Sequence, residues 1–215
     1  MQEKSNYVDI KITNWGKALD NTRFRNKLIA GVAILVVILL FLPSFFAFIE
    51  TRKGAVLNDV LLHYIGPIDL SIPIFIVIWS TTLLFIIRSF SQPYVFIKVI
   101  YCLIFLLLAR ILSIYLTPLD PPLSIIAIKD PLTSLTYGGK DVFITKDLFF
   151  SGHTSNMLML ALCFEKKIDK LIGYVAAVAV GTLVLFQHAH YTIDVLAAFI
   201  ITGFVVMIGK RVAEY

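Results

Sequence analysis

Six apolar runs separated by polar segments constrain this chain more than any other feature of its sequence. Three of the runs are near the ~20 residues that a helix needs to cross a bilayer, and three closer to the C-terminus are shorter. The predicted spans are residues 28–49, 68–87, 94–116, 151–164, 171–187 and 191–208. With a mean hydropathy of +0.87 and 15% charged residues, the chain is far too apolar for a water-soluble domain. We therefore predict an all-α polytopic membrane protein with six transmembrane helices in one bundle.

The regions outside the spans differ in character. Residues 1–27 are basic and amphipathic, which is typical of a segment lying on an anionic cytoplasmic membrane surface. Residues 28–215 form the predicted transmembrane catalytic domain. Its longest connection, residues 117–150, is rich in proline and glycine, which predicts a loop. Cys102 and Cys163 lie in apolar runs without metal or redox spacing, so we expect them to pack in the core.

The distribution of lysine and arginine predicts how the bundle is oriented. Twelve lie on the side of the two termini and five on the other side. The twelve are Lys4, Lys11, Lys17, Arg23, Arg25, Lys27, Arg88, Lys166, Lys167, Lys170, Lys210 and Arg211, and the five are Arg52, Lys53, Lys129, Lys140 and Lys146. By the positive-inside rule both termini are cytoplasmic, and the 117–150 loop faces the exterior or an organelle lumen. Because the net charge of +5 follows membrane topology and no basic patch alternates with aromatics, we predict no nucleic-acid binding.

Two polar interruptions carry the candidate chemistry. His190 and Asp194 stand four residues apart, so on a helix they share a face where the carboxylate can orient the imidazole. An unpaired carboxylate inside an apolar run would cost at least ~2.5 kcal/mol, which favours a functional pair. His153 opens the preceding apolar run in Ser151-Gly152-His153-Thr154. In the predicted topology both histidines reach the extracytoplasmic face, and Arg110 lies roughly 9 Å below the outer end of its span.

This arrangement suits phosphoryl transfer. Two helix N-termini together with Arg110 form an anion site, and phosphate chemistry needs charge neutralisation, a nucleophile and an acid. We predict His190 as the nucleophile, held by Asp194, and His153 as the acid that protonates the leaving alcohol. A transition-metal site formed by His153, His188, His190 and Asp194 is an alternative, although Arg110 would repel a cation. A non-catalytic lipid binder is another, although nothing in it requires the His190–Asp194 spacing.

The two motif segments resemble a known family. Ser151-Gly152-His153-Thr154 and His188 to Val195 are similar to the signature segments of the sphingomyelin synthase branch of the type 2 phosphatidic acid phosphatase superfamily. Asp147-Leu148-Phe149-Phe150, and Arg110 with the downstream Thr117-Pro118, extend the likeness. The resemblance implies a six-helix enzyme that moves a phospho-headgroup, such as phosphocholine or phosphoethanolamine, from a glycerophospholipid to ceramide or another lipid alcohol such as diacylglycerol. It implies a phosphohistidine at His190 and an extracytoplasmic active site. We predict no metal or other cofactor, because Arg110 and the two helix ends already supply positive charge.

The resemblance also guides the choice of substrate-binding residues and of the second candidate function. The residues predicted to bind substrate are Arg110, Ser151, Gly152, Asp147, His188 and Tyr191, and no metal ligand is assigned. Phosphatases of the superfamily carry Lys-x6-Arg-Pro, Pro-Ser-Gly-His and Ser-Arg-x5-His-x3-Asp. Here Ile111 follows Arg110, Phe150 precedes Ser151, and Val184 stands in place of the second arginine. A lipid phosphate phosphatase is therefore the second candidate, behind the transferase.

Overall fold

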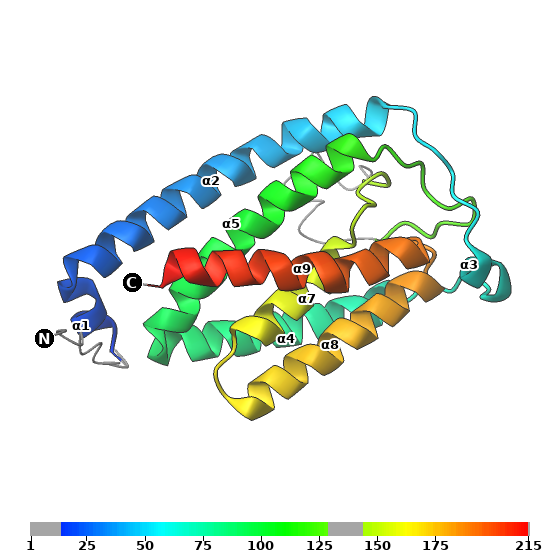
Figure 1. The fold of residues 1–215 in the computed structure, drawn as a ribbon. Helices are drawn as coiled ribbons and strands as arrows, with labels where there is room; N and C mark the ends of the chain where they lie inside the picture. The colour runs from blue at the N-terminus through cyan, green and yellow to red at the C-terminus, as the bar shows by residue number, and fades with distance from the viewer. Residues whose placement is uncertain (1–13, 129–143, 215) are drawn as a thin grey trace, which may run out of the picture.

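The structure, a computed structural model, describes residues 14–128 and 144–214 of the chain. Within these ranges the chain is helical and contains no strand, which confirms the predicted all-α class. The helices are α1 (Trp15–Asp20), α2 (Thr22–Thr51), α3 (Val60–Tyr64), α4 (Ser71–Ser91), α5 (Pro93–Leu116), α7 (Gly152–Cys163), α8 (Lys167–Phe186) and α9 (Thr192–Ala213). The six longer helices run alternately in opposite directions, and α3 lies with the connecting loops at the end away from α1 (Figure 1).

Five of these helices, namely α2, α4, α5, α8 and α9, are long and apolar enough to cross a membrane. The predicted count of six spans is not confirmed, because the predicted span 151–164 is a helix of only 12 residues. At ~1.5 Å per residue, such a helix reaches roughly 18 Å, well short of the ~30 Å hydrocarbon core. The helix ends at Cys163, close to the predicted boundary, and Phe164 is extended before the charged residues Glu165 and Lys166.

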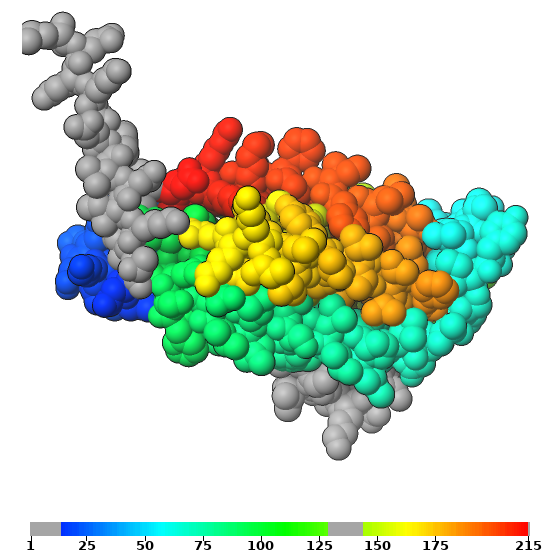
Figure 2. Space-filling view, turned by 90° about the horizontal axis from the view of Figure 1, so that it is seen from below, coloured from blue at the N-terminus to red at the C-terminus, as the bar shows by residue number. Residues whose placement is uncertain are grey.

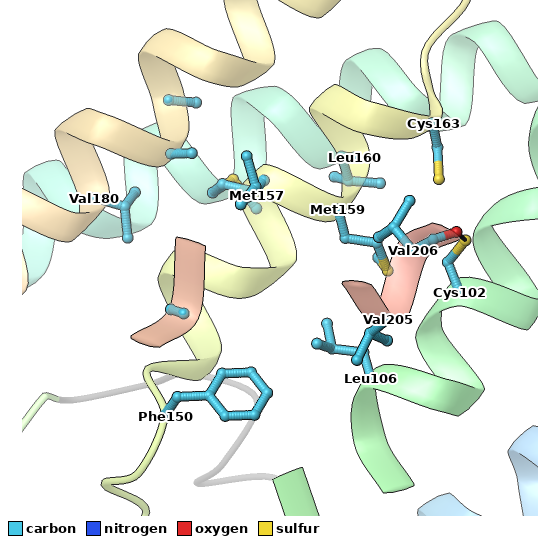
Figure 3. Close-up of a cluster of buried hydrophobic side chains, with 14 of the residues drawn as sticks. Cys102, Leu106, Phe150, Met157, Met159, Leu160, Cys163, Val180, Val205 and Val206 are labelled. Atoms are coloured by element: carbon cyan, nitrogen blue, oxygen red, sulfur yellow. Dashed lines mark hydrogen bonds between the residues drawn. The ribbon is translucent and has the colours of Figure 1, made fainter. Parts of the chain in front are cut away.

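The short helix α7 lies at the centre of the bundle. Nine of its residues are buried, and it packs against α8, α9, α5 and α4. Side chains from α5, α7, α8 and α9 meet around it, among them Leu106, Met157, Val180 and Val205 (Figure 3). In a bilayer, such contacts stabilise a bundle through close van der Waals packing, which small residues promote. At Gly173 of α8, a Cβ atom would lie 2.7 Å from the Cα of Ala161, so these two helices are in backbone contact.

The outer helices present apolar side chains to their surroundings. On α2, Leu40 is 74% exposed, and on α4, Ile72 is 75% exposed, as expected of residues that face lipid. Figure 2 shows α8 on the surface of the molecule between α4 and α9. Large apolar side chains therefore lie on the outside of the bundle as well as in its core, as expected of a protein that is surrounded by lipid.

The first span begins earlier than the predicted boundary at residue 28. Asn21 caps α2, because its Oδ1 accepts hydrogen bonds from the N–H groups of Arg23 at 2.9 Å and Phe24 at 3.2 Å. The preceding helix α1 packs on the bundle, and the Trp15 indole N–H donates to the Ser89 carbonyl at 2.8 Å. Residues 14–27 of the predicted basic segment thus join the bundle, and its residues 1–13 lie outside the described part of the chain.

The start of α2 and the end of α9 lie at the same end of the bundle. The Lys27 ammonium donates to the carbonyls of Val212 at 2.8 Å and Glu214 at 2.6 Å. At the opposite end, the loop after α2 joins the loop after α5 through a bridge between Ala55 and Leu119. This arrangement separates the bundle into an end near the termini and an end formed by loops, and the starts of α7 and α9 lie at the loop end (Figure 1). The cytoplasmic location of the termini stays a prediction.

Candidate active site

The two motif segments meet at the loop end of the bundle. Ser151 directly precedes α7, and its backbone N–H donates to the Asp194 carbonyl in the first turn of α9 at 3.1 Å. Gly181 of α8 also lies close to both segments. A Cβ atom at Gly181 would be 3.0 Å from the Val195 side chain and 3.4 Å from the Thr154 side chain. The close approach of three helices therefore brings together sequence segments that are far apart along the chain.

His190 and Asp194 form a buried pair. The His190 Nδ1 lies 3.4 Å from Asp194 Oδ2, and the two side chains are 5% and 0% exposed. The same carboxylate oxygen accepts the Tyr191 N–H at 3.0 Å, which fixes the carboxylate in the first turn of α9. The other oxygen, Oδ1, has no hydrogen-bond partner among the described residues. A separation of 3.4 Å exceeds an ordinary hydrogen bond, as is common in catalytic pairs without substrate.

Arg110 of α5 lies directly beside the start of α7. Its guanidinium is buried, donates to the Phe150 carbonyl and pairs with the Asp147 carboxylate. At Gly152, a Cβ atom would stand 2.7 Å from the guanidinium carbon and 2.8 and 2.9 Å from its two terminal nitrogens. Glycine is the residue that leaves space for this side chain. The chain segment before α7 is also fixed to α5, because the Ser113 hydroxyl is 2.9 Å from the Phe149 carbonyl.

The start of α7 has the electrostatic character of an anion site. No side chain caps this helix end, so its first N–H groups and its positive dipole end adjoin the Arg110 guanidinium. Asp147, whose side chain is 28% exposed, offsets one positive charge. His153 stands in this first turn, and its partly exposed ring lies 6.4 Å from the ring of Phe75 on α4. The positive charge at this point is therefore suited to the oxygens of a phosphate group.

The start of α9 differs from the start of α7, which corrects the expectation that both helix ends contribute to the anion site. The Thr192 N–H donates to the carboxylate of Asp59, and the Tyr191 N–H donates to Asp194. Two carboxylates therefore already neutralise the positive end of α9. At the start of α7 the N-cap residue makes no side-chain hydrogen bond, so we assign the anion site to this helix end.

Two of the predicted substrate-binding residues hold the loop between α8 and α9. His188 has φ of 53°, is 3% exposed, and its ring nitrogens contact the Ser124 hydroxyl and the Ile65 carbonyl, the latter at 2.8 Å. The Tyr191 hydroxyl donates to the Asp120 carbonyl at 2.9 Å and accepts the Leu57 N–H at 3.2 Å. Since both rings are engaged by the protein itself, we leave them out of the substrate contacts proposed below.

Sequence reasoning missed two residues of this end of the bundle, Asp59 and Gln187. Gln187 is fully buried, accepts the Leu70 N–H at 3.1 Å and donates to the Ser71 hydroxyl at 2.8 Å, and so holds the start of α4. Asp59 begins α3 and also binds Thr192. The run Asn58-Asp59 before an apolar turn is a recognisable helix-cap signal, but its long-range partner leaves no trace in the sequence.

The ligands of the alternative metal site are not gathered in one place. Within residues 14–128 and 144–214, no group of three or more His, Cys, Asp or Glu side chains could hold a metal ion. His188 in particular is turned toward Ser124 and Ile65. The geometry thus favours the anion-binding interpretation of this end of the bundle.

Fold and site together define a helical membrane protein with a buried histidine–aspartate pair next to an arginine-lined helix start. Residues 146–211 match the family described as PAP2 superfamily C-terminal. The match covers α7, α8 and α9 with Asp147 and both motif segments, whereas Arg110 lies outside it. A comparison with curated proteins found no match. The chain is therefore similar to the PAP2 superfamily over its C-terminal third, a likeness that supports lipid chemistry of the phosphatase or phosphotransferase type.

Proposed function

We propose that this protein is a membrane lipid phosphotransferase of the sphingomyelin synthase type. In this proposal it moves a phospho-headgroup from a glycerophospholipid to ceramide or another lipid alcohol such as diacylglycerol. The observation that carries the proposal is the position of the Arg110 guanidinium against Gly152. It places a permanent positive charge at the uncapped start of α7, within one hydrogen bond of the segment that holds His190 and Asp194.

The reaction has two steps with one covalent intermediate. His190 attacks phosphorus through Nε2, since Nδ1 faces Asp194, and the bond from phosphorus to the diacylglycerol oxygen breaks. His153 donates a proton to that oxygen as it leaves. In the second step the hydroxyl of the acceptor lipid attacks the phosphohistidine, His153 accepts its proton, and His190 is released. Arg110 and the first N–H groups of α7 neutralise the non-bridging oxygens in both steps.

The pairing of Arg110 with Asp147 supports a zwitterionic headgroup. The guanidinium and the carboxylate place a positive and a negative group side by side, with Asp147 the more exposed of the two. A phosphocholine or phosphoethanolamine group carries the opposite arrangement, a phosphate with an amine nearby. In the complex, the phosphate oxygens bind Arg110 and the amine lies at Asp147. Inositol and glycerol phosphates lack the cation that Asp147 would bind.

The proposed location is an integral membrane protein with both termini cytoplasmic and the active site on the extracytoplasmic face. The charge distribution in the sequence supports the sidedness. The fold supports the placement of termini and site at opposite ends of the bundle. Lys27 contacts Val212 at one end, and Ser151 contacts Asp194 at the other. Donor and acceptor both come from the bilayer.

A lipid phosphate phosphatase is the second candidate, favoured by the family match over residues 146–211. It would use the same first step, and water would take the place of the acceptor lipid. The two functions differ in the donor, which is a phosphodiester for the transferase and a lipid phosphate monoester for the phosphatase, and in what removes the phosphoryl group from His190. A binding protein or a metal site would show no turnover of this kind.

The test is to follow the headgroup of labelled phospholipids supplied to purified protein in nanodiscs. Phosphatidylcholine, phosphatidylethanolamine, phosphatidylinositol and phosphatidylglycerol are offered separately, each with ceramide, with diacylglycerol or without an acceptor. We expect label in a new lipid product only when an acceptor is present and the donor is zwitterionic. Release of inorganic phosphate from phosphatidic acid, offered in the same way without an acceptor, would favour the phosphatase. Absence of turnover with all donors, together with lipid retained by the protein, would overturn both in favour of a binder.

A further inference from the structure

Asp59 connects two helix starts that are distant in sequence. It is the N-cap of α3, where Oδ1 accepts the N–H of Leu61 at 3.0 Å and of Leu62 at 3.3 Å. The same carboxylate accepts two hydrogen bonds from Thr192, one from the backbone N–H and one from the hydroxyl at 2.9 Å. One side chain thus caps both α3 and α9.

A second connection runs parallel to the first. The Tyr191 hydroxyl accepts the Leu57 N–H at 3.2 Å, and the Tyr191 ring packs in a buried cluster with Leu62 and Leu148. The two residues that follow His190 are therefore both bound to the loop around Asp59. This loop holds the backbone that carries the imidazole.

The His190 side chain itself is held weakly. Its contact with Asp194 is 3.4 Å long, and Asp194 Oδ2 already accepts the Tyr191 N–H at 3.0 Å. The direction in which the ring points therefore depends on where the backbone of residues 190–192 lies. A displacement on the order of 1 Å at such a position can reduce a rate about a hundredfold.

We infer that Asp59 is a positioning residue for the His190–Asp194 pair, which it fixes by holding Thr192 at the start of α9. The inference deepens the proposed function, on which its kinetic consequence rests. It also explains why the start of α9 does not compete with the start of α7 for the phosphate, since the Asp59 carboxylate compensates the dipole of α9.

The protonation state of Asp59 agrees with this role. Partial burial acts to raise the pKa of its carboxyl, but the hydrogen bonds from Thr192, Leu62 and Leu61 outweigh it and hold the pKa below its ordinary value. Asp59 is therefore ionised at neutral pH, as a residue must be to accept four hydrogen bonds and oppose a helix dipole.

The test compares Asp59→Asn with Asp120→Asn, a matched control in the same layer of loops. The Asp120 side chain accepts from Gly54 at 3.2 Å and from Lys146 at 2.8 Å, whereas its contact with Tyr191 is made by the backbone carbonyl, which the substitution keeps. For Asp59→Asn we expect kcat to fall about ten- to a hundredfold with KM unchanged, because a hydrogen bond to a charged group is lost. In Thr192→Val, which loses only the hydroxyl of this residue, kcat should also fall. Thr192→Ser should retain the wild-type rate.

A second measurement does not depend on turnover. Carbethoxylation of His190 by diethyl pyrocarbonate, followed by mass spectrometry of folded protein, reports how freely the buried ring moves. We expect faster modification of His190 in Asp59→Asn and in Thr192→Val than in the wild type and in Asp120→Asn. If Asp59→Asn does not fold, kcat and the rate of His190 modification are compared between Thr192→Val and the wild type instead.

Unchanged kcat and unchanged His190 modification in Thr192→Val and in folded Asp59→Asn would overturn the inference. Equal losses in Asp120→Asn would also overturn it, since they would reflect general loosening of the loops. Wild-type protein that lacks turnover while Asp59→Asn still exposes His190 would refute the proposed function and leave the positioning role standing.

Discussion

The guanidinium of Arg110 occupies the space that a side chain at Gly152 would fill, with its carbon 2.7 Å from the site of the missing Cβ. A buried arginine is thereby held against the positive end of a helix, an unfavourable arrangement unless an anion is bound there. Asp147 compensates one charge in the absence of substrate. The relationship gives the glycine of the Ser-Gly-His motif a structural role, because its lack of a side chain leaves room for the guanidinium.

The first prediction is that Gly152→Ala inactivates the protein by displacing Arg110. A methyl group at this position overlaps the guanidinium, so the arginine must move from the start of α7. We expect kcat/KM to fall about a hundredfold, the effect of a roughly 1 Å misplacement. Headgroup transfer in nanodiscs measures it, with gel filtration to show that the variant is folded.

Gly203→Ala on α9 is the control for this substitution. No atom lies within 4 Å of a Cβ built at Gly203, so the added methyl meets nothing inside the protein. Its activity should equal that of the wild type, and its helix should gain about 0.5–1 kcal/mol of stability. A Gly152→Ala protein as active as Gly203→Ala would show that Arg110 is not the phosphate ligand.

The second prediction concerns the nucleophile. His190→Ala should abolish turnover and covalent labelling, and Asp194→Asn should keep the geometry but lower kcat by about 10⁴, by analogy with the buried aspartate of serine protease triads. Quenched reactions with headgroup-labelled lipid, followed by acid-lability tests, detect the phosphohistidine. Label on a residue other than His190, or turnover by His190→Ala at the wild-type rate, would refute the mechanism.

The helices and the active pair were predictable from the sequence because each rests on local chemistry. Long apolar runs have one stable conformation in a bilayer. The four-residue spacing predicted that His190 and Asp194 would meet, and their side chains do so, although His190 lies before the N-cap of α9 and not on the helix face that the sequence suggested. The bounds of α7 agree with the predicted run 151–164, but its place as a short internal helix was not predictable, because hydropathy does not distinguish a membrane span from a short helix enclosed by others. The Asp59–Thr192 and Arg110–Gly152 contacts arise from packing between distant segments, which no local pattern encodes.

The roles of His188 and Tyr191 illustrate the same limit of local reasoning. Both lie within the motif around His190, and their position alone groups them with the substrate contacts. Their partners, Ser124 and Ile65 for His188 and Leu57 and Asp120 for Tyr191, come from loops that are distant in sequence. Only the tertiary structure separates residues that hold the loop from residues that face the anion site.

The third prediction is a pH dependence of stability that involves Asp59. Because its pKa is lowered in the folded protein, its stabilising contribution is complete above the unfolded-state value of about 3.9 and is lost as the pH falls through the folded-state pKa. The melting temperature of Asp59→Asn in detergent should therefore lie below that of the wild type at pH 7, and the difference should narrow below about pH 4. A constant difference between pH 7 and pH 3 would contradict the assignment.

The fourth prediction concerns orientation. With Cys102 and Cys163 replaced, single cysteines are introduced at Lys53 and Lys167, both exposed and at opposite ends of the bundle. An impermeant thiol reagent added outside intact cells should modify the cysteine at position 53 and leave the one at position 167 unmodified, as the positive-inside rule requires. Modification of position 167 alone would invert the topology and move the active site to the cytoplasmic face.

The last prediction separates the roles of the two histidines. His153 is assigned as the acid for the leaving alcohol, and it stands in the first turn of α7 next to Gly152, where the phosphate is proposed to bind. Lipid alcohols are poor leaving groups, so His153→Ala should lower kcat about 10²- to 10⁴-fold with phospholipid donors, the usual contribution of general acid catalysis. A nitrophenyl phosphodiester has a leaving group that hardly needs a proton, so in the first turnover, before the second step is needed, the same variant should release nitrophenol at a rate close to that of the wild type. His190→Ala should fail with both donors, since the nucleophile is needed whatever group departs.

Absorbance of nitrophenol and transfer of labelled headgroup, measured on the same preparations, give the two rates. If His153→Ala lowers the rate equally with both donors, His153 acts in binding or folding rather than as the acid.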